Sequence, residues 1–174
     1  MEKVVLVDID DRQIGEMEKM EAHQKAVLHR AISVFVVNSK GQWLLQRRAF
    51  GKYHSNGLWS NTACSHPAPG ETTGEAAKRR LQEEMGMEPP LNHLFQFIYQ
   101  AQLDSNLTEH ELDHVFVGIS DKLPKPNPDE VSDFKYIDFV DLKNDVTLNP
   151  QNYTEWFKLI FDRVQREYTQ KFSN

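Results

Sequence analysis

Histidines and glutamates are spaced through this sequence in a way that could bind a metal ion. Two glutamates alternate within TEHELDH, so on a strand both carboxylates point to one face. Three imidazoles and two carboxylates form a ligand set suited to zinc, manganese or iron(II). The five residues are His23, His29, His66, Glu109 and Glu111. They come from three separate regions, so solvated or capping histidines and an exposed acidic strand are the alternative interpretation.

A second arrangement could bind an anion. Thr72 with Glu75 three positions later is typical of a helix start, and Gly86 of a helix stop. On that helix Arg80 and Glu84 stand one turn apart on one face, just after a loop that carries the only cysteine. A carboxylate, a guanidinium and a thiol together indicate a site for a metal ion and an anion. The alternative is a surface Arg80–Glu84 pair worth about 0.5 kcal/mol.

Composition limits the class of protein. The 174 residues predict a single domain, 1–174, and ten Phe and three Trp offset the low mean hydropathy of -0.62. A net charge of -6 argues against nucleic-acid or anionic-membrane binding. One cysteine excludes an internal disulfide and fits a reducing compartment. Because we find neither a secretory signal nor an apolar run of spanning length, we expect a cytoplasmic protein without stable membrane association.

The apolar pattern predicts strands before and after one central helix, with another helix at the end of the chain. Strands are expected at 3–7, 13–17, 30–37, 43–47, 91–103, 109–119 and 135–139. Residues 19–26 are helical or irregular, and residues 49–61 form a loop. An amphipathic helix is expected from Tyr153 onward. This order favours an α/β (α+β) sandwich, a mixed β-sheet between helices. The acidic pair Asp129-Glu130 is interpreted as solvated surface.

Residues 65–87 resemble the Nudix box, G-x5-E-x7-R-E-U-x-E-E-x-G-U, where U is aliphatic. The residues that match in register are Glu71, Arg79, Leu81, Glu83, Glu84, Gly86 and Met87. Ser65 replaces the leading glycine, and Arg80 replaces the glutamate after the arginine. In Nudix hydrolases that glutamate helps to hold magnesium, so its replacement weighs against hydrolysis.

Over nearly its whole length the chain is similar to the type 1 isopentenyl-diphosphate delta-isomerase family, which has the Nudix fold. The matching motifs are E-K-x-x-A-H at 18–23, L-H at 28–29, R-R-A at 47–49, G-x-W-x-N-x-x-C-x-H-P at 57–67, R-R-x-x-x-E-x-G at 79–86 and E-x-E at 109–111 followed by V-F. The resemblance implies interconversion of isopentenyl and dimethylallyl diphosphate, in isoprenoid biosynthesis, through a carbocation-like intermediate. A small isoprenoid diphosphate is then the substrate, and the resemblance favours a monomer.

The resemblance also implies roles for individual residues. One divalent transition metal, Mn²⁺ or Zn²⁺, would be bound by His23, His29, His66, Glu109 and Glu111. Glu111 and Cys64 would exchange protons on opposite faces of the substrate, with Tyr99 near the acid and Trp156 stabilising the cation. Mg²⁺ on Glu84 would bridge the diphosphate, which would be bound by Lys19, Arg48, Lys52 and Arg80. Glu83 receives no role. On residue type alone, Cys64 would be a buried structural thiol and Trp156 a core residue.

Two other functions stay open. A Nudix pyrophosphohydrolase acting on a nucleoside diphosphate derivative has no need of the Cys64-His66 element. A non-catalytic metal- or nucleotide-binding module would not require an acid, a thiol and a cation-stabilising ring together.

Overall fold

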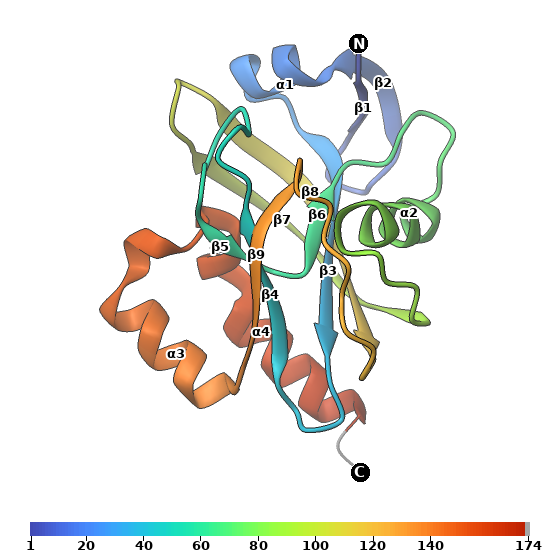
Figure 1. The fold of residues 1–174 in the computed structure, drawn as a ribbon. Helices are drawn as coiled ribbons and strands as arrows, with labels where there is room; N and C mark the ends of the chain where they lie inside the picture. The colour runs from blue at the N-terminus through green and yellow to red at the C-terminus, as the bar shows by residue number, and fades with distance from the viewer. Residues whose placement is uncertain (173–174) are drawn as a thin grey trace.

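A computed structural model describes residues 1–172 (Figure 1). Its strands are β1 (Lys3–Val7), β2 (Gln13–Glu18), β3 (His29–Val37), β4 (Trp43–Arg48), β5 (Trp59–Ser60), β6 (Ala63–Ser65), β7 (Leu91–Gln102), β8 (Thr108–Ile119) and β9 (Val131–Ile137). Its helices are α1 (Lys19–Lys25), α2 (Thr73–Met85), α3 (Phe139–Leu148), a 3-10 turn (Pro150–Asn152) and α4 (Glu155–Phe172).

Strand β3 is the centre of a mixed sheet. It runs parallel to β8, with His29 opposite Glu111 and Val37 opposite Ile119. On its other edge β6 pairs antiparallel, with Ser33 opposite Cys64. Strand β7 continues the sheet beyond β8, while β5 and β9 pair with β4. The strands that carry the predicted acid and the predicted thiol therefore flank β3.

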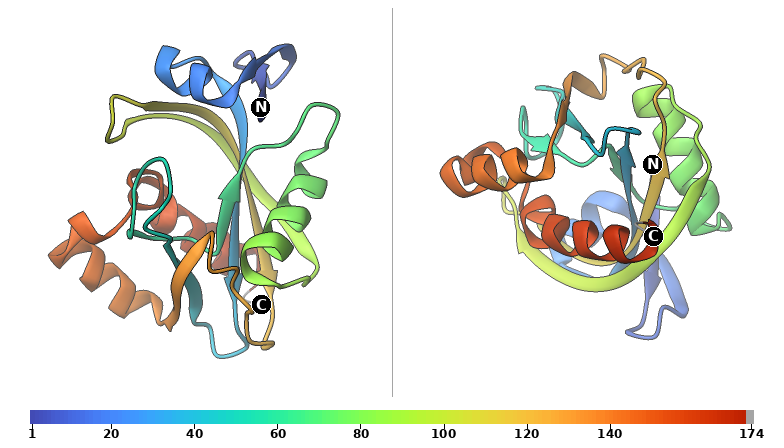
Figure 2. Two further views of the ribbon diagram at one scale, coloured as in Figure 1. Left: turned by 45° about the horizontal axis from the view of Figure 1, so that its top comes forward. Right: turned by 90° about the horizontal axis from the view of Figure 1, so that it is seen from below.

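The sheet is buried on both faces, because alternate residues of β3 enter two different cores. Phe35 and Val37 pack in the core that contains α4. Val34 and Val36 pack in the core that contains α2. Figure 2 shows these two helices on the two sides of the sheet. The predicted sandwich of a mixed sheet between helices is confirmed.

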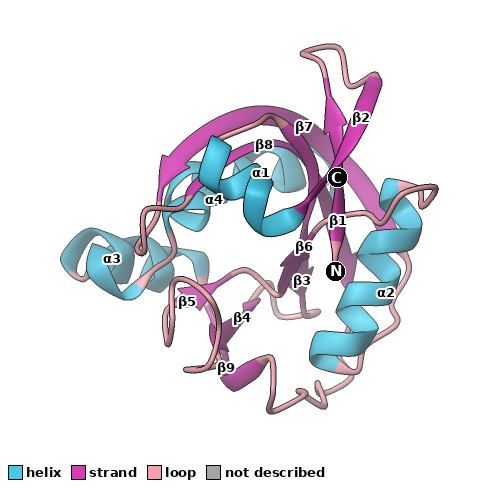
Figure 3. Cartoon of the chain, turned by 90° about the horizontal axis from the view of Figure 1, so that it is seen from above, coloured by secondary structure: helices cyan, strands magenta, loops and turns pink. Residues whose placement is uncertain are grey.

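An N-terminal unit lies across one end of the sheet. Strands β1 and β2 form a hairpin, and Leu6 of β1 pairs with His29 of β3. Helix α1 follows directly and lies against β8, as Figure 3 shows from above. The segment 19–26, expected as helical or irregular, is therefore a helix for most of its length. It brings the predicted site residues Lys19 and His23 to the end of β3.

Helix α3 was not expected. The sequence predicts a strand at 135–139, but β9 ends at Ile137 and Phe139 begins the helix. The helix forms because Phe139, Leu142 and Val146 recur at helical spacing and pack against the core that contains α4. No helix within residues 1–172 has both the length and the apolarity to cross a membrane.

The loop prediction for residues 49–61 is wrong at its end, since β5 lies within it. The short strand β6 likewise replaces the loop expected around Cys64. Both strands are too short for periodicity to reveal. They form because they pair with longer neighbours: β5 with β4, and β6 with β3.

Gly86 ends α2 in a conformation that favours glycine. Its φ is +62°, and its N–H donates to the Gln82 carbonyl. A Cβ at this position would lie 2.8 Å from the Lys125 carbonyl oxygen. We predict that Gly86→Ala lowers the free energy of unfolding by about 2 kcal/mol, measured by urea denaturation. Gly74→Ala is the control: it lies inside the same helix with open space around its Cβ, and it should stabilise by about 0.5 kcal/mol.

Candidate active site

Four of the predicted metal ligands converge at the end of β3. One donor atom from each of His23, His29, His66 and Glu111 lies within 4.8 Å of the others, and all four side chains are buried. Glu111 Oε1 is 2.9 Å from His66 Nε2, 3.4 Å from His29 Nε2 and 4.0 Å from His23 Nε2. Four donors from α1, β3, β8 and the residue after β6 thus surround one point.

The imidazoles are held in the form that binds a metal. His23 Nδ1 is 2.7 Å from the Lys19 carbonyl oxygen, and His29 Nδ1 is 2.8 Å from that of Val27. A carbonyl only accepts, so Nδ1 carries the hydrogen and Nε2 keeps its lone pair. Both Nε2 atoms are buried without a hydrogen-bond partner in the described chain. Burial, with a smaller effect of His66, lowers the pKa of His23 to about 4. The donors therefore fit a divalent cation.

Glu109 lies beside this cluster, outside the group of four. Its carboxylate groups instead with His23 and His54, and its Oε1 is 3.8 Å from His54 Nε2. Both glutamates extend from the same face of β8, as their alternation predicts. The structure thus places Glu109 next to the four-donor cluster, together with His54, a histidine that no sequence motif marks.

A tyrosine joins the two glutamates. The Tyr99 hydroxyl is 2.8 Å from Glu109 Oε2 and 2.7 Å from Glu111 Oε2. A hydroxyl has one hydrogen, so it donates to only one carboxyl while the other donates to it. Burial, reinforced by the charge of Glu111, raises the pKa of Glu109 well above its usual range. Burial also opposes ionisation of Glu111, but His29 and His66 hold its pKa well below the usual range. The three groups therefore form a proton chain that runs from Glu109 through Tyr99 to Glu111.

The thiol of Cys64 lines the same cavity as Tyr99 and Glu111. It lies on β6, so it approaches from the opposite edge of β3. Burial, with a smaller effect of Glu84, raises the pKa of Cys64 above its usual range. One wall of the cavity therefore carries a protonated thiol, and the other carries an ionised carboxylate.

Trp156 also lines this cavity, from the first turn of α4. Its Nε1 donates to Asn61 Oδ1 at 3.2 Å, which fixes the ring. The ring also packs in the core that contains α4, so it belongs both to the core and to the cavity wall. An aromatic face at this position can stabilise a positive charge that develops in the cavity.

Four basic side chains line the cavity and could bind an anion. They are Lys19, Arg48, Lys52 and Arg80. Arg48 is 7% exposed, and its Nε is buried with no hydrogen-bond partner among residues 1–172. Its Nη2 donates to the His54 carbonyl oxygen at 3.2 Å. A buried guanidinium with an unused donor is what an anion-binding site requires.

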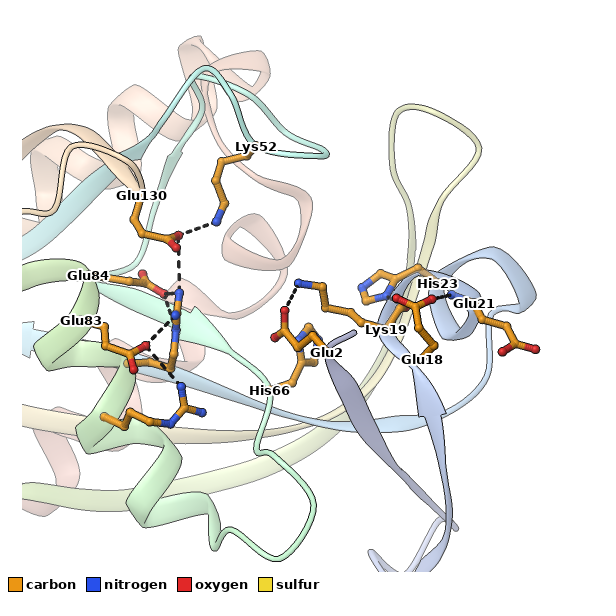
Figure 4. A network of polar contacts seen from close by, with 12 residues as sticks. Glu2, Glu18, Lys19, Glu21, His23, Lys52, His66, Glu83, Glu84 and Glu130 are labelled. Atoms are coloured by element: carbon orange, nitrogen blue, oxygen red, sulfur yellow. Dashed lines mark hydrogen bonds and ion pairs between the residues drawn. The ribbon is translucent and has the colours of Figure 1, made fainter.

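Glu84 pairs with Arg80 on one helix face, but its side chain is more deeply buried than a surface ion pair would be. Arg80 Nη2 is 2.7 Å from Glu84 Oε1, and Gln46 Nε2 donates to Glu84 Oε2 at 2.6 Å. Glu84 is 4% exposed, so the alternative of a solvated surface pair is wrong. Glu83 accepts from Arg80 Nη1 at 2.7 Å and thus orients that guanidinium (Figure 4).

Comparison with known proteins identifies the family. The NUDIX domain model matches residues 27–157. An isopentenyl-diphosphate Delta-isomerase of Pectobacterium atrosepticum is 52% identical over 99% of this chain and 96% of its own length. Isopentenyl-diphosphate Delta-isomerase 2 of Aromatoleum aromaticum is 51% identical over 94% of this chain and 86% of its own. The chain belongs to the isopentenyl-diphosphate Delta-isomerase family. The resemblance predicted from the sequence motifs is therefore confirmed.

Solved structures agree with the fold of this family. DR0079 from Deinococcus radiodurans superposes with a TM-score of 0.77 at 21% identity, covering 96% of this chain and 99% of that one. In the present chain, the Nudix-box residues Glu71 and Arg79 form a bidentate pair at 2.7 and 2.9 Å. That pair fixes the turn before α2 to the helix, while the next residue, Arg80, lines the cavity.

Sequence reasoning missed several residues that line the cavity of the present chain. Three of them are ionisable groups beside the predicted site residues: Glu2, His54 and Glu130. The interpretation of Glu130 as solvated surface is wrong, because its side chain is 25% exposed and it pairs with Lys52. Nothing in the local sequence distinguishes it from Asp129, which is exposed. Only the tertiary fold brings Glu130 to the basic residues.

Proposed function

We propose that this protein interconverts isopentenyl diphosphate and dimethylallyl diphosphate. The observation that carries the proposal is one cavity lined by a half-buried thiol on β6, a tyrosine-linked pair of glutamates on β8 and four basic side chains. Membership of the isopentenyl-diphosphate Delta-isomerase family supports the same reaction.

The reaction needs two proton transfers at carbon. One proton is added to the terminal alkene carbon, which leaves a positive charge on the tertiary carbon. Another proton is then lost from the CH2 carbon next to the cationic carbon, on the diphosphate side, and the double bond forms between these two carbons. Glu111 and Cys64 exchange these protons from the two edges of β3. One of the two groups must begin protonated and the other ionised, and the opposite pKa directions of Cys64 and Glu111 meet that need.

The cavity also has to protect the intermediate. A tertiary carbocation reacts with water, so the walls must exclude solvent. Trp156 is 3% exposed and offers its ring to the cation. Tyr99 is 7% exposed and relays a proton between the glutamates.

His23, His29, His66 and Glu111 would hold one divalent transition metal, Mn²⁺ or Zn²⁺, with Glu109 as the fifth ligand. When bound, the cation would supply positive charge that favours the ionised form of the coordinated carboxylate. Glu84 would hold Mg²⁺ together with the substrate diphosphate. Lys19, Arg48, Lys52 and Arg80 would bind the diphosphate oxygens, which fixes the alkene end of the substrate between Cys64 and Glu111.

We further infer that the chain acts as a single domain, 1–174, and as a monomer in the cytoplasm, without a nucleic-acid or membrane partner. Every group that the reaction needs comes from one chain, and the net charge of -6 disfavours polyanionic partners. Analytical ultracentrifugation should give a species of about one chain's mass. A dimer that persists on dilution would contradict the monomer.

The direct test uses deuterium oxide. The protein is incubated with isopentenyl diphosphate, Mg²⁺ and Mn²⁺ or Zn²⁺, and products are followed by proton NMR. We expect dimethylallyl diphosphate with deuterium at carbon. Unchanged isopentenyl diphosphate would overturn the proposal. Release of phosphate or of a nucleoside monophosphate from a panel of nucleoside diphosphate derivatives would favour a hydrolase instead.

Tyr99→Phe tests the proton chain. The variant keeps the ring and removes the hydroxyl that joins Glu109 to Glu111. We predict that kcat falls about tenfold to a hundredfold while the KM for the diphosphate substrate changes little. Tyr136→Phe on β9 is the matched control and should leave kcat unchanged. Equal kcat values in the two variants would contradict a role for the Tyr99 hydroxyl.

A further inference from the structure

Three of the four basic side chains that line the cavity already form ion pairs with glutamates that line the same cavity. Glu130 Oε2 is 2.5 Å from Lys52 Nζ and 3.5 Å from Arg80 Nη2. Separately, Glu2 Oε2 is 2.5 Å from Lys19 Nζ. Figure 4 shows these as two groups on different elements, Lys52 with Glu130 and Lys19 with Glu2. All five side chains line the cavity.

These ion pairs change what the site can bind. Of the four basic side chains, only Arg48 has no carboxylate within ion-pair distance in the described part of the chain. The Lys52 and Glu130 side chains are 21% and 25% exposed, so solvent screens their charges only in part. Burial opposes ionisation of Glu130, but the hydrogen bond from Lys52 and the charge of Arg80 keep its pKa below its usual value. Glu130 is therefore negative at neutral pH.

A free diphosphate would meet carboxylates as well as cations on entering this site. To bind, it would have to replace Glu130 on Lys52 and Arg80, and the displaced carboxylate would stay near the phosphate oxygens. Like charges at such distances repel. Mg²⁺ neutralises two of the diphosphate's negative charges, so its complex meets less repulsion from the same carboxylates.

We propose that Glu130, assisted by Glu2, makes this site select the Mg²⁺ complex of a diphosphate over the free anion. This inference rests on the proposed function, because it assigns the basic side chains to a diphosphate. Glu130 is then a specificity-determining residue, and it acts by repelling the wrong charge state of the ligand.

The carboxylate of Glu130 can be replaced without losing the backbone hydrogen bonds that this residue makes. The Glu130 N–H donates to the Asn127 carbonyl oxygen at 3.0 Å, and the Ala49 N–H donates to the Glu130 carbonyl oxygen at 3.0 Å. Both bonds use main-chain atoms, so Glu130→Gln keeps them. Asp129→Asn is a matched control, because it removes the same charge from an exposed neighbour that makes no ion pair within residues 1–172.

The test measures binding of inorganic pyrophosphate by titration calorimetry, with the transition metal present and with or without Mg²⁺. We expect the wild-type protein to bind the Mg²⁺ complex more tightly than the free anion. In Glu130→Gln the Kd of the free anion should fall about five- to tenfold, while that of the Mg²⁺ complex changes about twofold at most. Glu2→Gln should show a smaller shift in the same direction, since it releases one cation. Asp129→Asn should behave as wild type.

Three results would overturn this proposal. The first is an equal preference for the Mg²⁺ complex in Glu130→Gln and Asp129→Asn. The second is weaker binding of the Mg²⁺ complex by Glu130→Gln, which would make Glu130 a magnesium ligand. The third is a wild-type protein that binds no pyrophosphate. Isomerisation is measured separately by NMR, so a protein that selects the Mg²⁺ complex without isomerising would refute the proposed function alone.

Discussion

Replacing Cys64 with alanine should lower kcat for isomerisation about a thousandfold, the largest loss expected from a single substitution in this protein. One of the two proton transfers loses its group, and no other titratable side chain extends from β6 into the cavity. The free energy of unfolding should fall by only about 1 kcal/mol, because a single sulfur atom is removed. Turnover is measured by NMR with isopentenyl diphosphate, and stability by urea denaturation.

The control for Cys64→Ala is ligand binding. The substitution leaves all four basic side chains of the cavity in place, so the variant should bind Mg²⁺-pyrophosphate within about twofold of wild type. Cys64→Ser should also be nearly inactive, because a hydroxyl ionises far less readily than a thiol. Isomerase turnover of Cys64→Ala within tenfold of wild type would show that another group carries the proton.

Removal of the transition metal should abolish turnover and lower the melting temperature by about 10 °C. Three imidazoles and a carboxylate converge here, and two of the buried Nε2 atoms have no other partner in the described chain. A metal present at a thousand times its Kd stabilises the native state by about 4 kcal/mol. For a chain of this size that corresponds to roughly 10 °C. The measurement compares thermal unfolding and turnover before and after a chelator, and after Mn²⁺ or Zn²⁺ is restored.

A histidine pair separates this effect from general damage by the chelator. His29→Ala removes one donor and should melt at the same temperature with and without chelator. His93→Ala lies on β7, outside the metal-binding cluster, and should keep the full difference. If the chelator changed neither the melting temperature nor the turnover of the wild-type protein, a resident metal at this site would be excluded.

Much of this fold could be predicted from the sequence, because its long elements carry strong local signals. Thr72, Glu75 and Gly86 mark the ends of α2 correctly, and both capping-box hydrogen bonds form. Strands β5 and β6 could not be predicted, since only pairing with β4 and β3 keeps two or three residues extended. Intrinsic β-propensity does not predict a strand of only two or three residues.

Residues of the candidate site could be predicted where they belong to a sequence motif. They could not be predicted where only the tertiary fold brings them to the cavity. His66 belongs to a long motif, so its place near Cys64 could be anticipated. His54 and Glu130 carry no motif of their own. Glu130 reaches Lys52 only because β9 returns to pair with β4, which is a tertiary event.

The parallel pairing of β3 with β8 has a consequence for how this protein is made. Ser33 on β3 donates to Asp113 on β8, and these residues are 80 positions apart. Closing so long a loop is slow, and β4, β6 and α2 lie inside it. During synthesis on the ribosome, His23 and His29 emerge long before Glu111, so the complete set of donors meets only after β8 is in place. Capture of the metal would then be a late event in folding, and its rate would report the formation of the β3–β8 pair.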